Sequence, residues 1–177
     1  MSQIAHLCVY FIKERGIVMD HNEWKLIYET YRKELYFYAL SLTGNIADAE
    51  DLLQEAFLKA FLSYQSTGSI KYWLITVIRH EFYNMHRKRK KESSEESNVS
   101  SHPDILEKII ENEDRRQLYL AIQKLPIMMR DVLIQGIYLH MNDSEIAALN
   151  KITQENVRQI RSRAKKKLIQ ILEEVSQ

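Results

Sequence analysis

A short basic segment near the C-terminal end carries side chains suited to reading DNA. From Val157 to Leu168 the chain has six basic residues and no acidic one. Arg and amide side chains near the start of a helix can read base edges, and lysines farther along can neutralise phosphates. At roughly 100° per residue, the face opposite the core would carry Glu155, Gln159, Ser162 and Lys166, flanked by Arg158 and Arg163. We therefore expect this face to enter a major groove.

The residues around this face predict a helix-turn-helix. Asn142 and Glu145 have the spacing of a capping box that starts one helix, and Thr153 is a good N-cap for the next. A single apolar stripe then runs from Val157 to Ile171. The alternative interpretation is an amphipathic helix whose Lys and Arg are merely solvated. The lack of acidic residues in the basic segment favours DNA binding.

A second basic helix is predicted upstream. Apolar periodicity predicts a helix from Ile70 to Met85, and the basic run HRKRKK follows at residues 86–91. Basic groups interleaved with aromatic rings suit single-stranded nucleic acid, because charge follows the backbone and rings stack on unpaired bases. The alternative is that the aromatic residues belong to an ordinary core. On a helical wheel the face opposite the core carries Thr76, Arg79, His80, Tyr83 and Arg87, and the aromatic residues concerned are Trp73 and Tyr83.

Two further helices are predicted before this one. Apolar residues spaced by three and four predict a helix over residues 23–43, and Gly44 with Asn45 predicts a stop followed by a new N-cap. The next helix, over residues 48–61, has an acidic outer face that includes Asp51, Gln54 and Glu55. Judged from the residues alone, that face would simply be solvated.

Composition limits the possible functions. The 177 residues include four Gly and two Pro, which predicts a mostly helical chain, and the net charge of +1 means that any nucleic-acid surface must come from segregated charge. The single cysteine, Cys8, allows no internal disulfide or Cys-based zinc site and fits a reducing cytoplasm. The histidines lack metal-ligand spacing and no Gly-rich phosphate loop occurs. No apolar run approaches the roughly 20 residues of a membrane span.

A change of composition predicts a division of the chain. Residues 92–104 are polar and acidic with a proline near the end, which is typical of a linker. We expect an N-terminal extension over residues 1–22, helical domains over 23–91 and 105–177, and the linker between them. Translation could start at Met19, or residues 1–18 could be a loosely held tail.

Three segments in a fixed order carry a resemblance to a known family. They are ALSLTGNIADAEDLLQEAFLKAF, KYWLITVIRHEFYNMHRKRKK and LPIMMRDVLIQGIYLHMNDSEIAALNKITQENVRQIRSRAKKKL. They resemble, in turn, regions 2.1 to 2.2, the promoter-melting helix and region 4 of bacterial sigma factors of the extracytoplasmic-function (ECF) group. The resemblance covers roughly residues 24–172. It implies an all-α fold of two small helical domains, regions 2 and 4, joined by a flexible linker.

The resemblance also implies a function and roles for the residues above. The chain would bind core RNA polymerase and direct promoter-specific initiation, without catalytic centre, cofactor or small-molecule substrate. Asp51, Gln54 and Glu55 match positions that dock on the polymerase clamp. The upstream basic face, with the loop of residues 63–69, matches the elements that open and hold minus-ten DNA. The downstream face matches positions that read minus-thirty-five DNA. The resemblance further implies a cytoplasmic location and an anti-sigma factor as partner, a class of protein that is often membrane-bound.

The chain departs from the family pattern at three places. His80 stands where Asn is common, which bears on the preferred minus-ten base and on pH sensitivity. The turn carries Asn150-Lys151 in place of a Leu-Gly pair, and Asn150 could adopt the left-handed conformation one position early. If it cannot, the angle between the two helices would differ from the family's. Ile160 replaces a common basic residue, which predicts one phosphate contact fewer.

Two other function classes remain as alternatives. A stand-alone helix-turn-helix regulator would explain the C-terminal half, but would leave the acidic face and the upstream basic helix without a purpose. An enzyme such as a recombinase, using the helix-turn-helix to find its site, is the third class. The absence of metal-ligand and phosphate-loop motifs argues against it.

Overall fold

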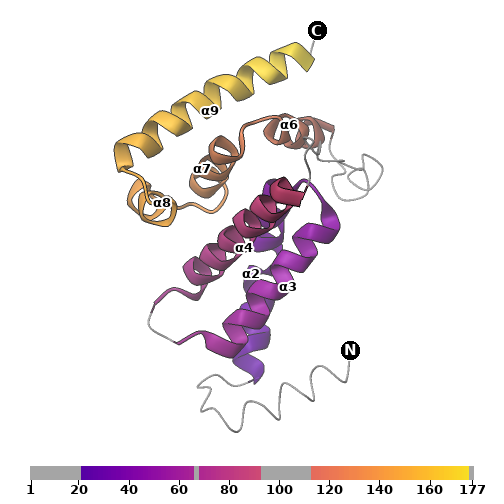
Figure 1. Ribbon diagram of the computed structural model, residues 1–177, viewed down its shortest axis with the longest axis vertical. Helices are drawn as coiled ribbons and strands as arrows, with labels where there is room; N and C mark the ends of the chain where they lie inside the picture. The colour runs from indigo at the N-terminus through magenta and orange to yellow at the C-terminus, as the bar shows by residue number, and fades with distance from the viewer. Residues whose placement is uncertain (1–20, 66–67, 93–112, 176–177) are drawn as a thin grey trace.

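The computed structural model describes residues 21–65, 68–92 and 113–175, and within these ranges the regular structure is entirely α-helical (Figure 1). The prediction of an all-α fold is therefore confirmed. The helices are α2 (His21–Thr43), α3 (Ile46–Ser63), α4 (Ile70–Glu92), α6 (Glu113–Gln123), α7 (Ile127–Ile137), α8 (Asp143–Asn150) and α9 (Gln154–Val175).

Helices α2, α3 and α4 form an N-terminal bundle around the predicted apolar stripes. Leu35, Tyr38 and Leu42 of α2 are buried there, whereas Tyr28, at the same three-and-four spacing, is 41% exposed and lies edge-on against the Phe57 ring. Aromatic pairs prefer this edge geometry, so the half-exposed ring still contributes packing. The register of α2 is thus as predicted, and Trp24 in its first turn is also buried.

The turn between α2 and α3 has the predicted chemistry. Gly44 adopts a left-handed backbone with φ 66°, and its N–H donates to the Leu40 carbonyl at 2.9 Å. Only glycine takes this conformation without steric cost. The Asn45 side chain then accepts the Asp48 N–H at 3.1 Å and caps α3.

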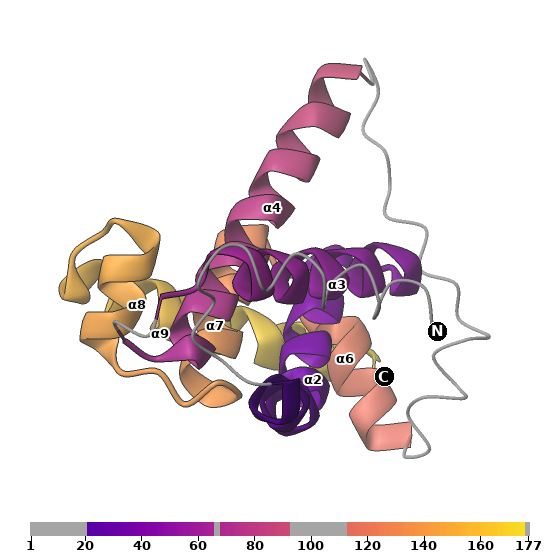
Figure 2. The ribbon, with the colours of Figure 1, turned by 90° about the horizontal axis from the view of Figure 1, so that it is seen from below.

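Helix α4 continues through the basic run to Glu92, beyond the predicted end near Met85. Arg89 extends its guanidinium to Asp48 in the first turn of α3, with two N–H to oxygen distances of 2.7 Å. This bidentate pair helps to hold the extension against α3. Figure 2 shows the last turns of α4 projecting away from the other helices.

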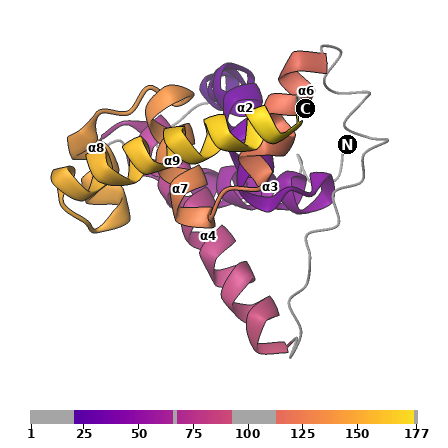
Figure 3. The same cartoon turned by 90° about the horizontal axis from the view of Figure 1, so that it is seen from above.

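Helices α6 to α9 form a C-terminal bundle that contains the predicted helix-turn-helix. Both hydrogen bonds of the Asn142–Glu145 capping box are present, and Thr153 accepts the Asn156 N–H at 3.2 Å at the start of α9. The long helix α9 packs on α7 and α8, and Figure 3 shows it lying across them. The helix-turn-helix is confirmed in the structure.

The turn between α8 and α9 differs from the expected one. Lys151, rather than Asn150, adopts the left-handed conformation, with φ 56° and ψ 43°. Asn150 remains helical because its buried side-chain N–H group donates to Gln135 and to the Ile146 carbonyl, both at 2.7 Å. A side chain anchored in this way cannot follow the backbone into the turn.

The two bundles pack against each other and share one apolar core. Buried residues of α2 and α4 are continuous with those of α6 to α9, and both α6 and α7 contact α2. The described halves are therefore docked to one another.

Several predictions concern parts of the chain outside the described residues. These are most of the N-terminal extension, the linker, the first turns of the second predicted domain (residues 105–112) and the middle of the loop over residues 63–69. Among the helices that the structure describes, none combines the length and apolar character that a membrane span requires.

Candidate nucleic-acid and partner interfaces

The predicted recognition face lies on the outer side of α9. Val157, Ala164 and Ile171 on the opposite side are buried in the C-terminal bundle, which fixes the rotation of the helix. The five side chains expected to contact DNA are all exposed: Arg158, Gln159, Ser162, Arg163 and Lys166. The structure thus presents them together on one open surface of suitable chemistry.

Two arginines of α9 are held by a carboxylate at the start of α8. Arg158 Nε lies 3.1 Å from Asp143 Oδ2, and Arg161 Nη2 lies 2.6 Å from Asp143 Oδ1. Arg161 also covers Gly136 of α7, where an added Cβ would lie 3.2 Å from its Nη1. Arg161 therefore joins three helices, a role that the count of basic residues did not reveal.

The predicted face of α4 is divided by the docking of the C-terminal bundle. Thr76, His80 and Arg87 are exposed, and the His80 side chain is 70% exposed beside Glu81. Arg79 and Tyr83 instead turn toward α7, and the Arg79 side chain is only 17% exposed. The helical wheel placed all of these residues on one face, but tertiary packing separates them.

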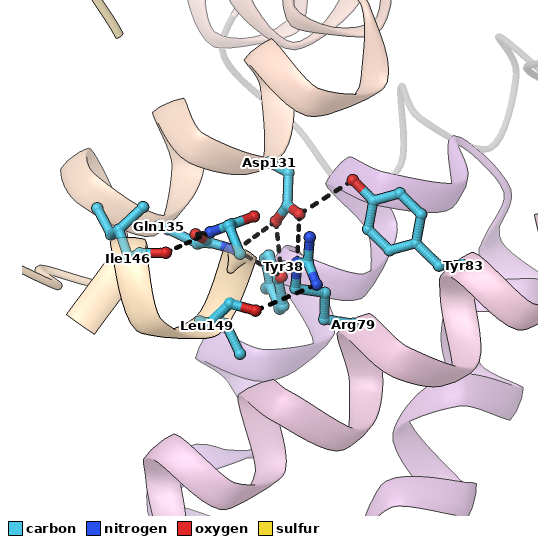
Figure 4. A network of polar contacts seen from close by, with 8 residues as sticks. Tyr38, Arg79, Tyr83, Asp131, Gln135, Ile146 and Leu149 are labelled. Carbon is cyan, nitrogen blue, oxygen red and sulfur yellow. Dashed lines mark hydrogen bonds and ion pairs between the residues drawn. The ribbon is translucent and has the colours of Figure 1, made fainter. Parts of the chain in front are cut away.

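Asp131 of α7 is the centre of this packing (Figure 4). Its side chain is fully buried. Oδ1 accepts hydrogen bonds from Tyr38 Oη at 2.8 Å and Gln135 Nε2 at 2.6 Å. Oδ2 accepts from Arg79 Nε at 2.9 Å and from Tyr83 Oη at 3.3 Å. The carboxylate thus joins three helices from both bundles.

Burial dominates the protonation equilibria of this cluster. It raises the pKa of Asp131 even though Arg79 opposes the shift. Burial, with Asp131 as the next cause, raises the pKa of Tyr83 to about 12 and that of Tyr38 well above its ordinary range. The tyrosines therefore act as hydrogen-bond donors at neutral pH.

Sequence reasoning assigned no role to Asp131 or Gln135. The available signal was a carboxylate and an amide four residues apart in a mainly apolar helix that also contains Arg130, a spacing that places the carboxylate and the amide on one face. Such a pair in a core-forming helix indicates a buried polar contact, because unpaired buried charges are very costly.

Trp73 lies at the boundary between core and surface. It is partly buried, and its ring meets the Tyr64 ring edge-on with centroids 5.8 Å apart. The Tyr64 hydroxyl in turn donates to the Gly68 carbonyl, which ties the described ends of the loop together. The position of Trp73 therefore fits both a core role and a role in stacking on an unpaired base, since part of the ring packs and part remains accessible.

The acidic face of α3 is open and continues into an apolar patch. Asp51, Gln54 and Glu55 are exposed, and on the same side Leu58 and Leu62 are 46% and 48% exposed. Exposed leucines grouped beside charged groups are typical of a protein-binding surface. The leucines extend this candidate interface beyond the residues identified from sequence.

Comparisons with known proteins agree with this architecture. Residues 27–92 match the family described as Sigma-70 region 2. The ECF RNA polymerase sigma factor SigM of Bacillus subtilis is 29% identical over 153 residues, covering 80% of this chain and 90% of that protein. The sigma factor SigX of the same organism is 24% identical, covering 82% and 81%.

Solved structures share the fold. The sigma factor RpoE of Bartonella quintana, in complex with the anti-sigma factor NepR, has a TM-score of 0.69 at 23% identity and covers 85% of this chain and 97% of that one. CnrH, in complex with the cytosolic domain of CnrY, has a TM-score of 0.66 at 17% identity, covering 92% and 96%. Residues 27–92 thus match sigma-70 region 2, and the chain as a whole is similar to RNA polymerase sigma factors of the ECF group.

Proposed function

We propose that this chain binds core RNA polymerase and directs promoter-specific transcription initiation. The observation that carries the proposal is the open acidic and apolar face of α3 in the same chain as two basic helices. A stand-alone helix-turn-helix regulator needs only α8 and α9 and has no use for that face. The chain has no catalytic role of its own in this scheme, because core polymerase supplies the chemistry.

The proposal assigns one function to each surface. Asp51, Gln54 and Glu55 dock on the polymerase clamp, with Leu58 and Leu62 as apolar support. The face of α4 opens and holds minus-ten DNA through Trp73, Thr76, Arg79, His80, Tyr83 and Arg87. Unstacking a base costs a few kcal/mol, which a basic and aromatic surface can offset.

Helix α9 reads minus-thirty-five DNA in the major groove. Arg158, Gln159, Ser162, Arg163 and Lys166 supply the base and phosphate contacts, and their exposure supports this assignment. Arg158 must exchange Asp143 for DNA, which is feasible because an exposed ion pair is worth at most about 1 kcal/mol.

The same proposal places the protein in the cytoplasm with an anti-sigma factor as regulator. The solved structure of RpoE, which shares this fold, is a complex of a sigma factor with an anti-sigma factor, which supports a partner of this kind here. Exposed Leu58 and Leu62 offer a surface for it, and the regulator could be anchored in the membrane.

Competition for core polymerase tests the proposal. Replacing Asp51 and Gln54 together by Ala removes two exposed side chains three residues apart, so we expect weaker polymerase binding with an unchanged circular dichroism spectrum. Run-off transcription from the chain's promoter should fall in parallel. A double variant that still competes normally contradicts the clamp assignment.

Gln170 and Glu173 offer a matched control. They are also an exposed amide and carboxylate three residues apart, but on α9. Their replacement by Ala should leave polymerase competition unchanged. If the wild type binds duplex promoter DNA but never starts transcripts with core polymerase, the stand-alone regulator is the correct interpretation instead.

A further inference from the structure

Asp143, in the first turn of α8, holds two arginines of α9 at once. Its Oδ2 accepts the Arg158 Nε–H at 3.1 Å, and its Oδ1 lies 2.6 Å from Arg161 Nη2. The two arginines are three residues apart, so they project from the same side of the helix. Contacts between charged groups at such distances are stronger than hydrogen bonds between neutral groups. Each oxygen of this carboxylate thus has its own cation.

The two arginines differ in how firmly their surroundings hold them. The Arg161 side chain is 28% exposed and crosses Gly136 of α7, where an added Cβ would lie 3.2 Å from Nη1 and 3.7 Å from Cδ. The Arg158 side chain is 58% exposed, and its contact with Glu155 is longer, at 3.7 Å. Arg161 is therefore fixed on Asp143, whereas Arg158 has room to turn outward.

Arg158 is a proposed minus-thirty-five contact, so its release from Asp143 is a step in DNA binding. A carboxylate left alone beside DNA would repel the phosphates, because like charges at close range are unfavourable. The Asp143 side chain is also partly buried, so water and salt screen its charge incompletely. Arg161 lowers this cost, because it remains paired with Oδ1 after Arg158 has left.

We propose that Arg161 is a positioning residue for minus-thirty-five recognition, which keeps Asp143 neutralised so that Arg158 can move to the DNA. Arg161 itself does not touch DNA in this scheme. The inference rests on the proposed role of Arg158 at the minus-thirty-five element. Without the Arg161 charge, Arg158 is the remaining cation on Asp143 among the described residues, and it is then withheld from DNA.

The test measures duplex binding by the full-length protein in complex with core polymerase, or by the protein alone if no complex forms. The probe is a dye-labelled duplex that the wild type has selected from a random-sequence pool. Arg161→Gln removes the charge and keeps the stem that covers Gly136, and circular dichroism checks its fold. We expect it to bind the probe about fivefold more weakly than the wild type. Arg161→Lys keeps a charge near Asp143 and should stay within about twofold.

Rescue by a second substitution separates this role from simple packing. Asp143→Asn in the Arg161→Gln background removes the charge that retains Arg158. We expect the double variant to bind within about twofold of the wild type. Damage to the packing around Arg161 would not be repaired by removing another contact of the same cluster. If the double variant binds as weakly as Arg161→Gln, the proposal is overturned.

A second pair of variants tests for a direct contact between Arg161 and DNA. In the Arg158→Ala background we expect Arg161→Gln to weaken binding by less than about twofold, because Arg161 acts only through Arg158. Lys165→Ala is the matched control, since it removes one charge from an exposed position of the same helix. Its loss should be the same with and without Arg158. Fully additive losses for Arg161→Gln overturn the proposal, because general attraction to phosphates gives that result.

Failure of the site assignment has a different signature. If Arg158→Ala leaves affinity unchanged, Arg158 is not a DNA contact, and the assignment and this inference fail together. If Arg158→Ala weakens binding but its loss adds to that of Arg161→Gln, the inference alone fails. Should Arg161→Gln not fold, Arg161→Met keeps an apolar stem over Gly136 without the charge and carries the same expectations.

Discussion

Helices α4 and α9 are both basic and both carry predicted DNA contacts, yet their surroundings differ. On α9 all five predicted residues are exposed, and the apolar stripe is satisfied within its own bundle. On α4 one side packs on α2 and α3 while Arg79 and Tyr83 pair with Asp131 of the other bundle. A basic face predicted from sequence therefore does not show whether its side chains are available to DNA. A carboxylate far away along the chain can form ion pairs with them in the folded protein.

The largest expected effect comes from removing the α4 cation at this contact. Arg79→Ala leaves the fully buried Asp131 without its ion-pair partner, so we expect the free energy of unfolding to fall by about 3 kcal/mol. Urea denaturation followed by circular dichroism measures the change. Arg158→Ala, which breaks the ion pair between the exposed Arg158 of α9 and Asp143 of α8, should cost under about 1 kcal/mol. Equal losses for the two variants would remove the contrast between the helices.

The next effect concerns the exposed face of α9. Arg163→Ala should leave stability unchanged but cost about 1 to 3 kcal/mol in binding at one base pair of the minus-thirty-five element. Promoter variants bound by the polymerase complex provide the measurement. Lys166→Ala should instead weaken binding to all variants alike and lower the salt dependence, as for a phosphate contact. An Arg163→Ala protein with unchanged base preference rules out direct reading by this residue.

A smaller effect is expected at the turn that sets the position of α9. Lys151 has a left-handed backbone, which is unfavourable for a residue with a Cβ atom, so Lys151→Gly should raise the free energy of unfolding by about 1 kcal/mol. Lys151→Ala retains the Cβ and should give no such gain. Thermal melting of both variants tests this, and a gain shared by both would locate its cause in the side chain rather than in the backbone.

The smallest effect comes from a contact on the other side of α4. The hydrogen bond from Lys59 is the main cause that lowers the pKa of Glu81, and His80 adds to it. A lowered acid pKa contributes stability above the pKa of the unfolded side chain, about 4.3, and the contribution is lost as pH falls below it. Because the Lys59 side chain is 39% exposed and solvent screens the pair, we expect this contribution to the free energy of unfolding to be under about 1 kcal/mol.

The wild type and Glu81→Gln provide the comparison for this effect. The difference between their unfolding free energies should be present at pH 7 and disappear near pH 3. A difference that persists at the low pH would mean that the ion pair is not its source.

Local signals in the sequence were sufficient for the helices and most of their ends. Gly44, Asn45, Asn142 and Thr153 act through atoms only a few residues away, so their roles could be predicted without a fold. The rotation of α9 followed equally from its apolar stripe. Even the turn shows the limit of this approach, because Lys151 rather than Asn150 became left-handed once Asn150 bonded to Gln135 of another helix.

The sequence by itself therefore determined the all-α fold, the helix-turn-helix and the outward face of α9, since each depends on periodicity or on neighbours within one turn. Only the tertiary structure decided the state of the melting face. Asp131 is 52 residues from Arg79 and 93 from Tyr38 along the chain. No local sequence pattern can predict such a contact, because it exists only when the two bundles bury the carboxylate between them.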